Sequence, residues 1–404
     1  GGTMGTGILN INGTAQVNVA AAGAFPNDRI YLSGYGGSGT INLNGGTLTS
    51  ERSIQHGSGG GPSIMNFDGG TLRAGANINV ENSLTSANVL AGGAILDSGS
   101  YTLNFNEPLL NGGGGGGLTV QGSGTVVLAS GSTYTGATAV NGGTLALAGG
   151  SAIPDAGAVV LANAAGARLQ LNNSETIGSL AGGGPLGGNV NLQGNTLTTG
   201  GNGTSTTFAG VISGTGALVK TGAGAMTLDG NSNYTGTTTI TGGSLIFGPA
   251  SGSTTSRLYI GQSGGAGAVI QNGGTLSVAP TTGSTDVVSL GLGGGYGYYQ
   301  MNGGTLTTGQ LAAGSGSGAN NTGVFDLNGG TVSVTGGGGW LLAGGWQANS
   351  KGSFNLYGGT LAGPAAQPVT LNVFNNAGSY AMFNLLGSGA VLDATANGNG
   401  LNLL

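Results

Sequence analysis

The chain has 404 residues, of which 95 are Gly, 5% are charged and none is Cys. The absence of Cys excludes disulfide, thiolate-zinc and iron–sulfur designs, and seven scattered Lys and Arg with a formal net charge of -5 argue against nucleic-acid binding, which needs clustered cations. Hydrophobic residues still make up 38% of the chain in short regular groups, so the composition favours a repeat fold with a thin core over a disordered polymer.

The first expected elements are short strands separated by Gly-rich turns. An apolar strand at Ile30-Tyr-Leu32 precedes a Gly/Ser-rich loop and then the motif Ile41-Asn-Leu-Asn-Gly-Gly-Thr-Leu48, which returns as Met65-Asn-Phe-Asp-Gly-Gly-Thr-Leu72. Ile41 and Leu43, two residues apart, face one side of a strand. Asn-Gly-Gly bends the chain because Asn and Gly tolerate positive φ. Helix is disfavoured nearly everywhere, because each Gly costs about 1 kcal/mol in a helix.

The middle of the chain repeats at a longer interval. Residues 124–145 match residues 224–245 at a constant offset of 100, so that Tyr134-Thr-Gly136 corresponds to Tyr234-Thr-Gly236. Ordered spacings match over the whole segment, and not only the Gly content. This indicates a true internal repeat.

The last third returns to the first motif, with copies at Tyr299–Leu306, Phe325–Val332 and Phe354–Leu361. The Thr of the motif recurs after 24 residues (47 to 71), 30 (275 to 305), 26 (305 to 331) and 29 (331 to 360). These lengths suit one solenoid coil of about three short strands with turns. A β-hairpin meander would use the same turn residues, but it predicts shorter repeats and leaves many open strand edges.

Residues 118–248 resemble the autotransporter-associated β-strand repeat, also called the passenger-associated transport repeat. The resemblance rests on five stretches: Ile177-Gly-Ser-Leu180, Phe208-Ala-Gly-Val-Ile-Ser-Gly-Thr-Gly216, Lys220-Thr-Gly-Ala-Gly224, Tyr234-Thr-Gly236 and Thr241-Gly-Gly-Ser-Leu245. It implies a right-handed parallel β-helix exported to the bacterial cell surface, with a role in adhesion, aggregation or as a rigid stalk. Autotransporters end in a membrane barrel and this chain ends at Leu404 without one, which implies that the barrel was removed or that export follows another route.

We therefore expect an all-β fold, a right-handed parallel β-helix (β-solenoid) of short strands with Gly/Asn-rich turns, over residues 1–404. Three sub-segments are distinguished: irregular repeats at 1–117, the best-matching autotransporter-type repeats at 118–248, and Asn-Gly-Gly-Thr-Leu repeats at 249–404. No run of 18 apolar residues occurs, so no membrane-spanning helix and no membrane insertion by this segment are expected. The chain begins at Gly1, which indicates a processed or trimmed product.

Aromatic residues gather in the last third, and they predict a possible surface for binding sugars or a protein partner. The alternative is an aromatic ladder stacked on the solenoid. The residues are Tyr296, Tyr298, Tyr299, Trp340, Trp346 and Tyr357.

No catalytic, cofactor-binding or metal-binding residue is expected. His56 is the single His and is interpreted as a solvated loop residue, which leaves a Ser-His-Asp site without support. Glu51 and Arg52 with Asp68 and Arg73 form the one dense charged group, and stacked surface ion pairs explain it as well as an active site does. The run Gly112–Gly117 lacks the Lys-Ser/Thr of a phosphate loop and is interpreted as a flexible loop between solenoid segments.

The predicted function is an extracellular structural protein that self-associates into a surface filament or rigid stalk, and not an enzyme. Both chain ends look like continuing repeat. End-to-end or lateral assembly with other copies is therefore one hypothesis, and excision from a longer solenoid is the other. The alternative function is an adhesin passenger that binds glycans or neighbouring cells, and a third is a polysaccharide-active β-helix enzyme.

Overall fold

The computed structural model describes residues 5–21, 29–129, 131–278, 287–314, 318–335, 340–343, 347–363, 369–372, 377–393 and 401–403. Every regular element in these ranges is a β-strand. The chain divides into two compact units, residues 1–191 and 192–404. The boundary between them falls within the segment 118–248 that the sequence set apart. Each unit is a stack of parallel strands.

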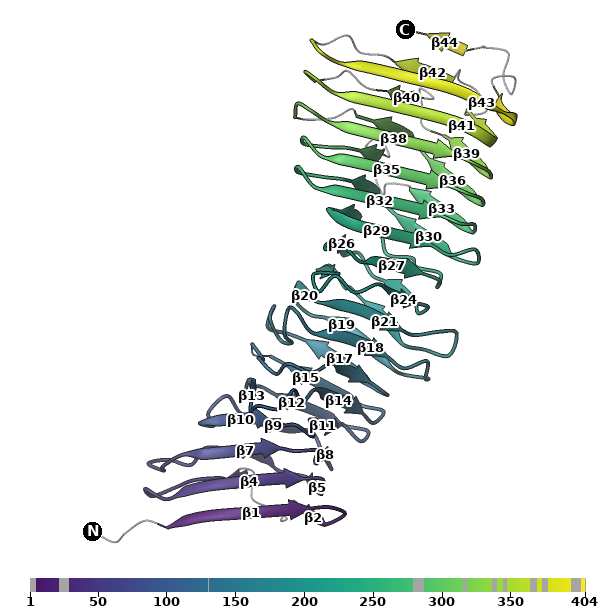
Figure 1. Cartoon of the computed structure of the whole chain (residues 1–404). Helices are drawn as coiled ribbons and strands as arrows, with labels where there is room; N and C mark the ends of the chain where they lie inside the picture. The colour runs from purple at the N-terminus through teal and green to yellow at the C-terminus, as the bar shows by residue number, and fades with distance from the viewer. Residues whose placement is uncertain are drawn as a thin grey trace. The chain divides into compact units, whose positions relative to one another are not determined.

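In the first unit, successive coils place their strands in three parallel sheets (Figure 1). The β1–β13 sheet contains β1 (Thr6–Asn12), β4 (Ser38–Asn44), β7 (Ser63–Phe67), β10 (Ser86–Val89) and β13 (Leu109–Asn111). The β2–β21 sheet contains β2 (Gln16–Val19), β5 (Thr47–Ser50), β8 (Thr71–Ala74), β11 (Ala94–Asp97), β14 (Leu118–Gln121), β16 (Thr138–Val140), β18 (Ala158–Leu161) and β21 (Ser179–Gly182). The β3–β22 sheet contains β3 (Arg29–Tyr31), β6 (Ser53–Gln55), β9 (Ile78–Val80), β12 (Thr102–Phe105), β15 (Thr125–Leu128), β17 (Thr144–Leu147), β19 (Arg168–Leu171) and β22 (Asn189–Asn191), and β20 spans Glu175–Ile177.

The second unit is built in the same way. The β23–β44 sheet contains β23 (Thr196–Thr199), β26 (Ala217–Lys220), β28 (Thr237–Ile240), β31 (Arg257–Ile260), β34 (Val287–Leu290), β37 (Gln310–Ala313), β40 (Trp340–Ala343), β42 (Val369–Asn372) and β44 (Leu401–Leu403). The β24–β43 column contains β24 (Thr206–Phe208), β27 (Ala225–Leu228), β29 (Gly242–Phe247), β32 (Ala266–Gln271), β35 (Tyr296–Met301), β38 (Thr322–Leu327), β41 (Lys351–Ala362) and β43 (Tyr380–Asp393). The β30–β39 column contains β30 (Gly252–Thr255), β33 (Thr275–Val278), β36 (Thr305–Thr308) and β39 (Thr331–Val334), and β25 spans Ile212–Ser213.

The register confirms the repeat predicted from the motif. Thr47 lies opposite Thr71, and Thr275, Thr305, Thr331 and Thr360 lie opposite one another in turn. Each Thr-to-Thr interval is therefore one coil. The pairings between the described strands are parallel, and antiparallel contacts there are isolated bridges between single residues. The hairpin meander is thus excluded for the described strands, and the all-β parallel solenoid is confirmed.

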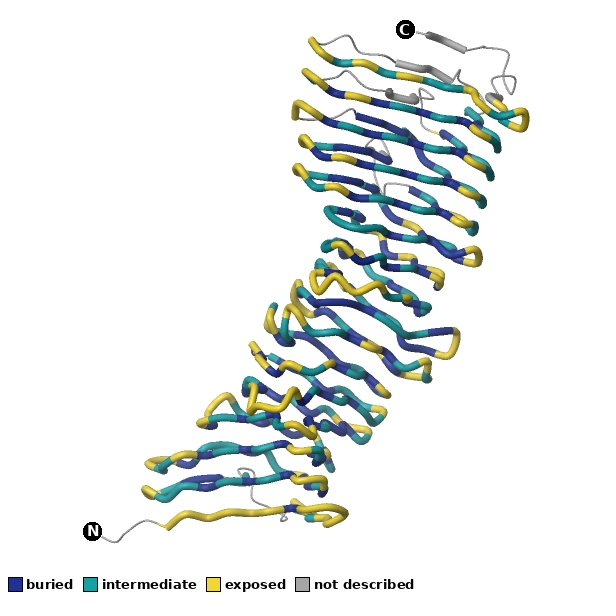
Figure 2. Tube along the Cα trace, in the orientation of Figure 1, coloured by how far each residue is buried: buried dark blue, intermediate teal, exposed yellow. Residues whose placement is uncertain are grey.

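The core of each unit is a set of apolar columns, one residue per coil. Alternate residues of each strand point inward, which gives the alternation of buried and less buried positions in Figure 2. In the first unit one column runs Leu48, Leu72, Leu96, Val120, Val140 and Leu161, all at most 1% exposed. Each such side chain contributes about 1.5–3 kcal/mol by leaving water, so the core is assembled in small equal portions.

Outward-facing Asn side chains form hydrogen-bonded ladders between coils. In the first unit, Asn42 donates from Nδ2 to Oδ1 of Asn10 at 2.7 Å, Asn66 donates to Asn42 at 2.8 Å, and Asn88 donates to Asn66 at 2.8 Å. A second-unit ladder joins Asn328 to Asn302 and Asn302 to Asn272, both at 2.9 Å. In each case the later residue donates to the earlier one. The ladders explain why Asn recurs at the same motif position.

The Tyr-Thr-Gly motif of the 100-residue repeat forms a buried corner. Tyr134 and Tyr234 are 1% and 2% exposed. Their hydroxyls bond to the hydroxyls of Thr138 and Thr238, four residues later, at 2.6 and 2.5 Å. Burial raises the pKa of Tyr234 to about 12 despite the opposing effect of its hydrogen bond with Thr238. The phenol therefore stays neutral and fills the interior while its one polar atom is paired.

Glycine is required where one coil turns directly over the backbone of the preceding coil. Gly222 has φ +65°, and a Cβ there would lie 2.0 Å from the carbonyl oxygen of Gly200. Gly116, in the run Gly112–Gly117, has the same role, because a Cβ there would lie 1.8 Å from the Leu90 carbonyl oxygen, whereas a Cβ on Gly113 or Gly115 would meet no atom within 4 Å. This run joins β13 to β14 within one coil and packs on the preceding coil. Its interpretation as a loop between solenoid segments is therefore wrong, and its flexibility stays a prediction.

Tyr134→Phe should destabilise its coil more than Tyr234→Phe. The first change leaves the Thr138 hydroxyl buried without its side-chain partner, at a cost of about 1–2 kcal/mol. After the second, Thr238 keeps its 2.9 Å bond to the Thr255 hydroxyl. Hydrogen exchange of peptides covering 118–147 and 218–247 measures the local opening free energies. The double variant Tyr134→Phe with Thr138→Val is the control and should recover most of the loss, and equal effects of the two Tyr variants would contradict this account.

Gly222→Ala should lower the unfolding midpoint much more than Gly203→Ala. Both glycines have positive φ, +65° and +73°, but a Cβ on Gly203 meets no atom within 4 Å. The control change therefore costs only the conformational penalty of about 1–2 kcal/mol. We expect more than about 3 kcal/mol for Gly222→Ala, because backbone on both coils has to move. Urea unfolding followed by circular dichroism measures the difference, and similar midpoints would refute the close-approach argument.

Candidate functional site

Tyr299, one of the six predicted surface aromatics, belongs to the core. It is 0% exposed, and its hydroxyl donates to Oε1 of the buried Gln271 at 2.6 Å. Its ring lies 5.0 Å from that of Phe325, which lies 6.0 Å from that of Phe354. The prediction of a partner-binding role for Tyr299 is therefore wrong, because strand alternation turns it inward. The alternative interpretation, an aromatic ladder, is correct for this residue.

Tyr296 and Tyr298 are on the outer face of the same strand, β35. Tyr296 is 46% exposed, and Tyr298 is half-buried with its hydroxyl donating to Oδ2 of Asp326 on β38 at 2.9 Å. Burial raises the pKa of Tyr298 to about 12, and the hydrogen bond and charge of Asp326 add to the shift. The two rings border a shallow groove of about 290 Å³ with small residues beside them, including Ala266, Gly267 and Ala268. This arrangement offers aromatic surface next to a carboxylate.

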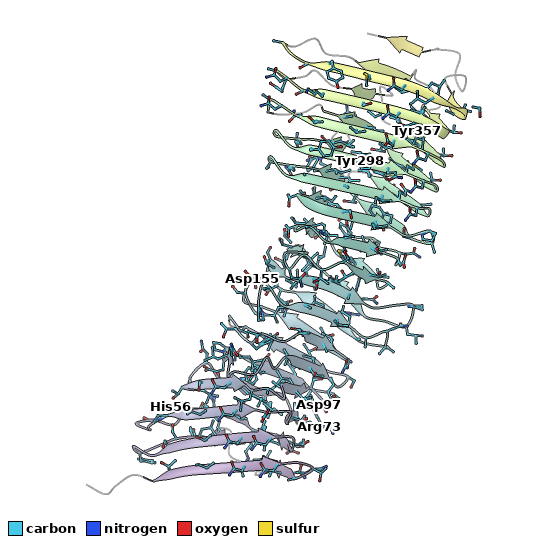
Figure 3. All side chains as sticks on the ribbon, viewed as in Figure 1. His56, Arg73, Asp97, Asp155, Tyr298 and Tyr357 are labelled. Atoms are coloured by element: carbon cyan, nitrogen blue, oxygen red, sulfur yellow. The ribbon has the colours of Figure 1, made fainter. Side chains whose placement is uncertain are left out.

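The other predicted aromatics are not all gathered at this groove. Tyr357 is 46% exposed on β41 and contributes to the raised pKa of Tyr298; Figure 3 labels both residues. Trp340 is in β40, which belongs to the β23–β44 sheet and not to the strand column of the tyrosines. Trp346 lies outside the described residues. The structure places Tyr296 and Tyr298 at this groove, and Tyr357 lies two coils further on, near enough to affect the pKa of Tyr298. We call these three tyrosines the aromatic patch.

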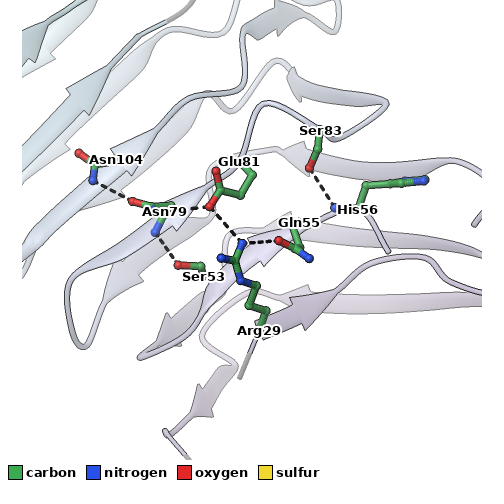
Figure 4. Close-up of polar contacts among 8 residues, drawn as sticks. All are labelled: Arg29, Ser53, Gln55, His56, Asn79, Glu81, Ser83 and Asn104. Atoms are coloured by element: carbon green, nitrogen blue, oxygen red, sulfur yellow. Dashed lines mark hydrogen bonds and ion pairs between the residues drawn. The ribbon is translucent and has the colours of Figure 1, made fainter. Parts of the chain in front are cut away.

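A second groove, on the β3–β22 sheet of the first unit, was not predicted from the sequence. Arg29 forms an ion pair with Oε1 of Glu81 at 3.2 Å and also donates to Oε1 of Gln55 (Figure 4). Asn79 donates to Glu81 at 3.4 Å, and Asn104 donates to Asn79 at 2.8 Å. The groove has a volume of about 600 Å³. Its residues are far apart in sequence, so only the coil register could have identified it.

His56 lies in the loop after β6, at the rim of this polar groove. Its Nδ1 is 2.8 Å from the Ser33 hydroxyl and 3.0 Å from the Ser63 hydroxyl, and its backbone N–H donates to the Ser83 hydroxyl at 3.2 Å. The residue is half-buried. The side chain is less solvated than expected, because the Ser33 and Ser63 hydroxyls contact one ring nitrogen. No carboxylate among the described residues orients this imidazole, so the arrangement lacks the third group of a catalytic triad.

The charged group proposed around Glu51 separates into independent contacts. Glu51 accepts the Ala21 N–H at 2.8 Å, and Asp68 accepts the Gly92 N–H at 2.6 Å. Arg73 pairs instead with Asp97, at 3.8 Å, in a groove of about 660 Å³ on the β2–β21 sheet. Across the described part of the chain, no three His, Asp or Glu side chains are placed to hold a metal ion. Glu51 and Asp68 thus bind backbone amides, and the ion-pair partner of Arg73 lies outside the predicted group.

Three charged side chains are buried at coil corners and were also missed. Glu107 accepts the Leu84 N–H at 3.1 Å, and Glu175 accepts the N–H groups of Ala152 and Ile153 at 3.3 and 3.2 Å. Lys220, 1% exposed, donates to the carbonyls of Thr221, Gly222 and Gly242 at 2.6, 3.1 and 3.3 Å. Burial lowers the pKa of Lys220 and raises that of Glu107. These groups satisfy turn amides and carbonyls that a bare corner would leave unpaired.

Comparison with known proteins connects these corners to a described repeat. The family model named passenger-associated-transport-repeat matches residues 118–147 and 218–247. This confirms the predicted resemblance, and the two matches are offset by the expected 100 residues. Each contains one Tyr-Thr corner, and the second contains the Lys220 corner.

One curated relative extends the comparison beyond the repeats. Over 225 residues, 55% of this chain, the sequence is 32% identical to a protein named adhesin BmaC autotransporter from Brucella suis biovar 1 (strain 1330). The chain spans 5% of the length of that relative. No solved structure matches the chain. In the part of the chain that the structure describes, no helix has the length and apolar character needed to span a membrane.

Glu175 should make the first unit less stable as the pH rises from 5 to 8. Burial raises its pKa from 4.5 to about 7, against the opposing effect of the two amides, with a further increase from Asp155. The folded state therefore prefers the protonated acid, so its stabilising contribution is present below the unfolded pKa and is lost as the pH passes 7. We expect a loss on the order of 2 kcal/mol, and Glu175→Gln should abolish it. Urea titrations at several pH values measure this, and an unchanged pH slope in the variant would contradict it.

Proposed function

We propose that the chain is a stalk-forming segment of an extracellular, adhesin-like passenger at the bacterial cell surface, and that it has no enzymatic activity. The observation that carries this proposal is the 32% identity to an autotransporter adhesin over 55% of the chain, together with the two matched repeats. Stacked parallel coils in both units are consistent with it. A solenoid of this kind resists bending because each coil is hydrogen-bonded to the next.

The physical properties of the coils suit a protein exported as an extended chain. Each coil buries its own small share of the core and contacts its neighbours, so folding can propagate from one coil to the next. The chain has no Cys, so this process needs no oxidation. The buried Glu, Lys and Tyr side chains are engaged at corners within the stack, which supports a structural role for them.

The aromatic patch of Tyr296, Tyr298 and Tyr357 is a surface of the second unit suited to contact a partner. Exposed Tyr rings present a large, rigid contact area with a polar tip. Self-association into a filament remains a prediction. Self-association and adhesion differ in the surface that makes contact. Sedimentation of the purified chain distinguishes the two hypotheses, because only self-association predicts large assemblies without a partner.

Surface export can be tested by fusing the chain between an N-terminal epitope and an autotransporter barrel in a laboratory strain. We expect the epitope to be accessible on intact cells and the solenoid to resist a protease concentration that degrades the unfolded chain. Retention inside the cell, or rapid degradation on its surface, would remove the support for an extracellular stalk.

Adhesion through the aromatic patch can be tested on the same cells. The double variant Tyr296→Ser with Tyr298→Ser should reduce binding to cultured host cells several-fold relative to the parent chain, because it removes the exposed rings. Tyr101→Ser is the matched control, since Tyr101 is 42% exposed but lies in the first unit. No adhesion above the barrel alone, or equal losses in both variants, would count against the patch.

A further inference from the structure

The polar groove of the first unit gathers groups that are rare in this chain. The sequence has seven Lys and Arg, 12 Asp and Glu and one His among 404 residues. Arg29, Glu81 and His56 nevertheless line the same groove, with Gln55, Asn82 and Asn106. An outer face can be polar without charged side chains or His, because Thr, Ser and Asn make the coils polar elsewhere.

The coil register places these groups on one outer face. Arg29 lies opposite Ser53, Tyr31 lies opposite Gln55, and Ile54 lies opposite Val80, which sets Gln55 beside Glu81. The strands β3, β6 and β9 are successive members of one sheet, spaced about 4.8 Å apart. The groove therefore crosses several coils along the stacking direction.

The charge balance of the groove selects its ligand. Arg29 and Glu81 neutralise each other at 3.2 Å, and their side chains remain 37% and 30% exposed. An anionic ligand would meet the Glu81 carboxylate and a cationic one the Arg29 guanidinium. The remaining lining groups are the amides of Gln55, Asn82 and Asn106, the Ser83 hydroxyl and the His56 imidazole, which together offer both donors and acceptors of hydrogen bonds. Tyr31, 54% exposed, lies outside this lining and offers a ring at the register position beside Gln55.

We propose that this groove binds a neutral glycan, with the sugar chain lying across successive coils. Sugar hydroxyls donate and accept at once, which matches the mixed amide, hydroxyl and ion-pair lining. An apolar sugar face can rest on the Tyr31 ring. The groove volume of about 600 Å³ is within the range of small-ligand sites. This assignment rests on the proposed adhesin-like function and names its partner class.

The test uses the purified full chain with cellotetraose and maltotetraose as neutral probes and tetragalacturonate as the anionic probe. Saturation-transfer NMR detects binding, and titration gives the Kd. We expect a neutral tetrasaccharide to bind, and Arg29→Gln or Glu81→Gln to weaken it about tenfold or more through loss of charge-assisted hydrogen bonds. Tyr31→Ala should also weaken it. A half-exposed ion pair adds little to stability, so these variants should unfold at the temperature of the parent.

Arg73→Gln is the matched control, because Arg73 also belongs to an outward-facing ion pair but lies on the β2–β21 sheet. It should leave the Kd unchanged. The proposal is overturned if neither neutral tetrasaccharide binds, if only tetragalacturonate binds, or if Arg73→Gln and Arg29→Gln have equal effects. Surface display of the same chain is scored separately. A chain that folds and reaches the cell surface but binds none of the sugars contradicts the glycan site alone. A chain that does not reach the cell surface contradicts the stalk proposal.

Discussion

Backbone hydrogen bonding between successive coils is the constraint on which the rest of this structure depends. In-register parallel pairing holds each strand at a fixed distance from its neighbour, and it brings the corners of adjacent coils into direct contact. At Gly222 and Gly116 a side chain would overlap a carbonyl of the preceding coil. Glycine is therefore a requirement of stacking at these corners, and most of the side chains that form the core stand on the short strands between them.

The same stacking determines how polar groups can be used. A position in one coil lies beside the equivalent position in the next, so like charges in a column would repel. The columns instead contain complementary neighbours, as in Arg73, Asp97 and Gln121. Where a charge is buried, at Glu175 or Lys220, backbone groups of a corner bind it. The outer faces of such a fold are therefore built from columns of several coils.

The sequence was sufficient for the architecture and insufficient for most of the surface. The Thr positions of the Gly-Gly-Thr motif gave coil lengths that the register confirms, because the repeat spacing is itself the register. Strand alternation could also have excluded Tyr299 from the predicted surface aromatics. Met301, two residues later, and Phe325, the register partner of Tyr299, are inward-facing apolar residues. The groove of Arg29, Gln55 and Glu81 could not be foreseen without aligning three coils of unequal length. The hydroxyl contacts of His56 were missed for a related reason, because they come from different coils.

The amide ladders have a direction, and this limits what can stand in them. In each ladder the side chain later in the sequence donates the hydrogen bond to the earlier one, so the first member needs only to accept. Asp326 is such a first member: Asn355 donates to it at 2.7 Å, and Asn384 donates to Asn355 at 2.7 Å. Gln300, its neighbour in the preceding coil, donates to Asn302 instead. An Asp can therefore stand at the first position of a ladder, where the side chain only accepts. At any later position it would interrupt the ladder, because a carboxylate cannot donate to the preceding residue. Spontaneous loss of ammonia from an Asn within a ladder would sever it at that point, so the lifetime of such a surface depends on the chemical ageing of single amides.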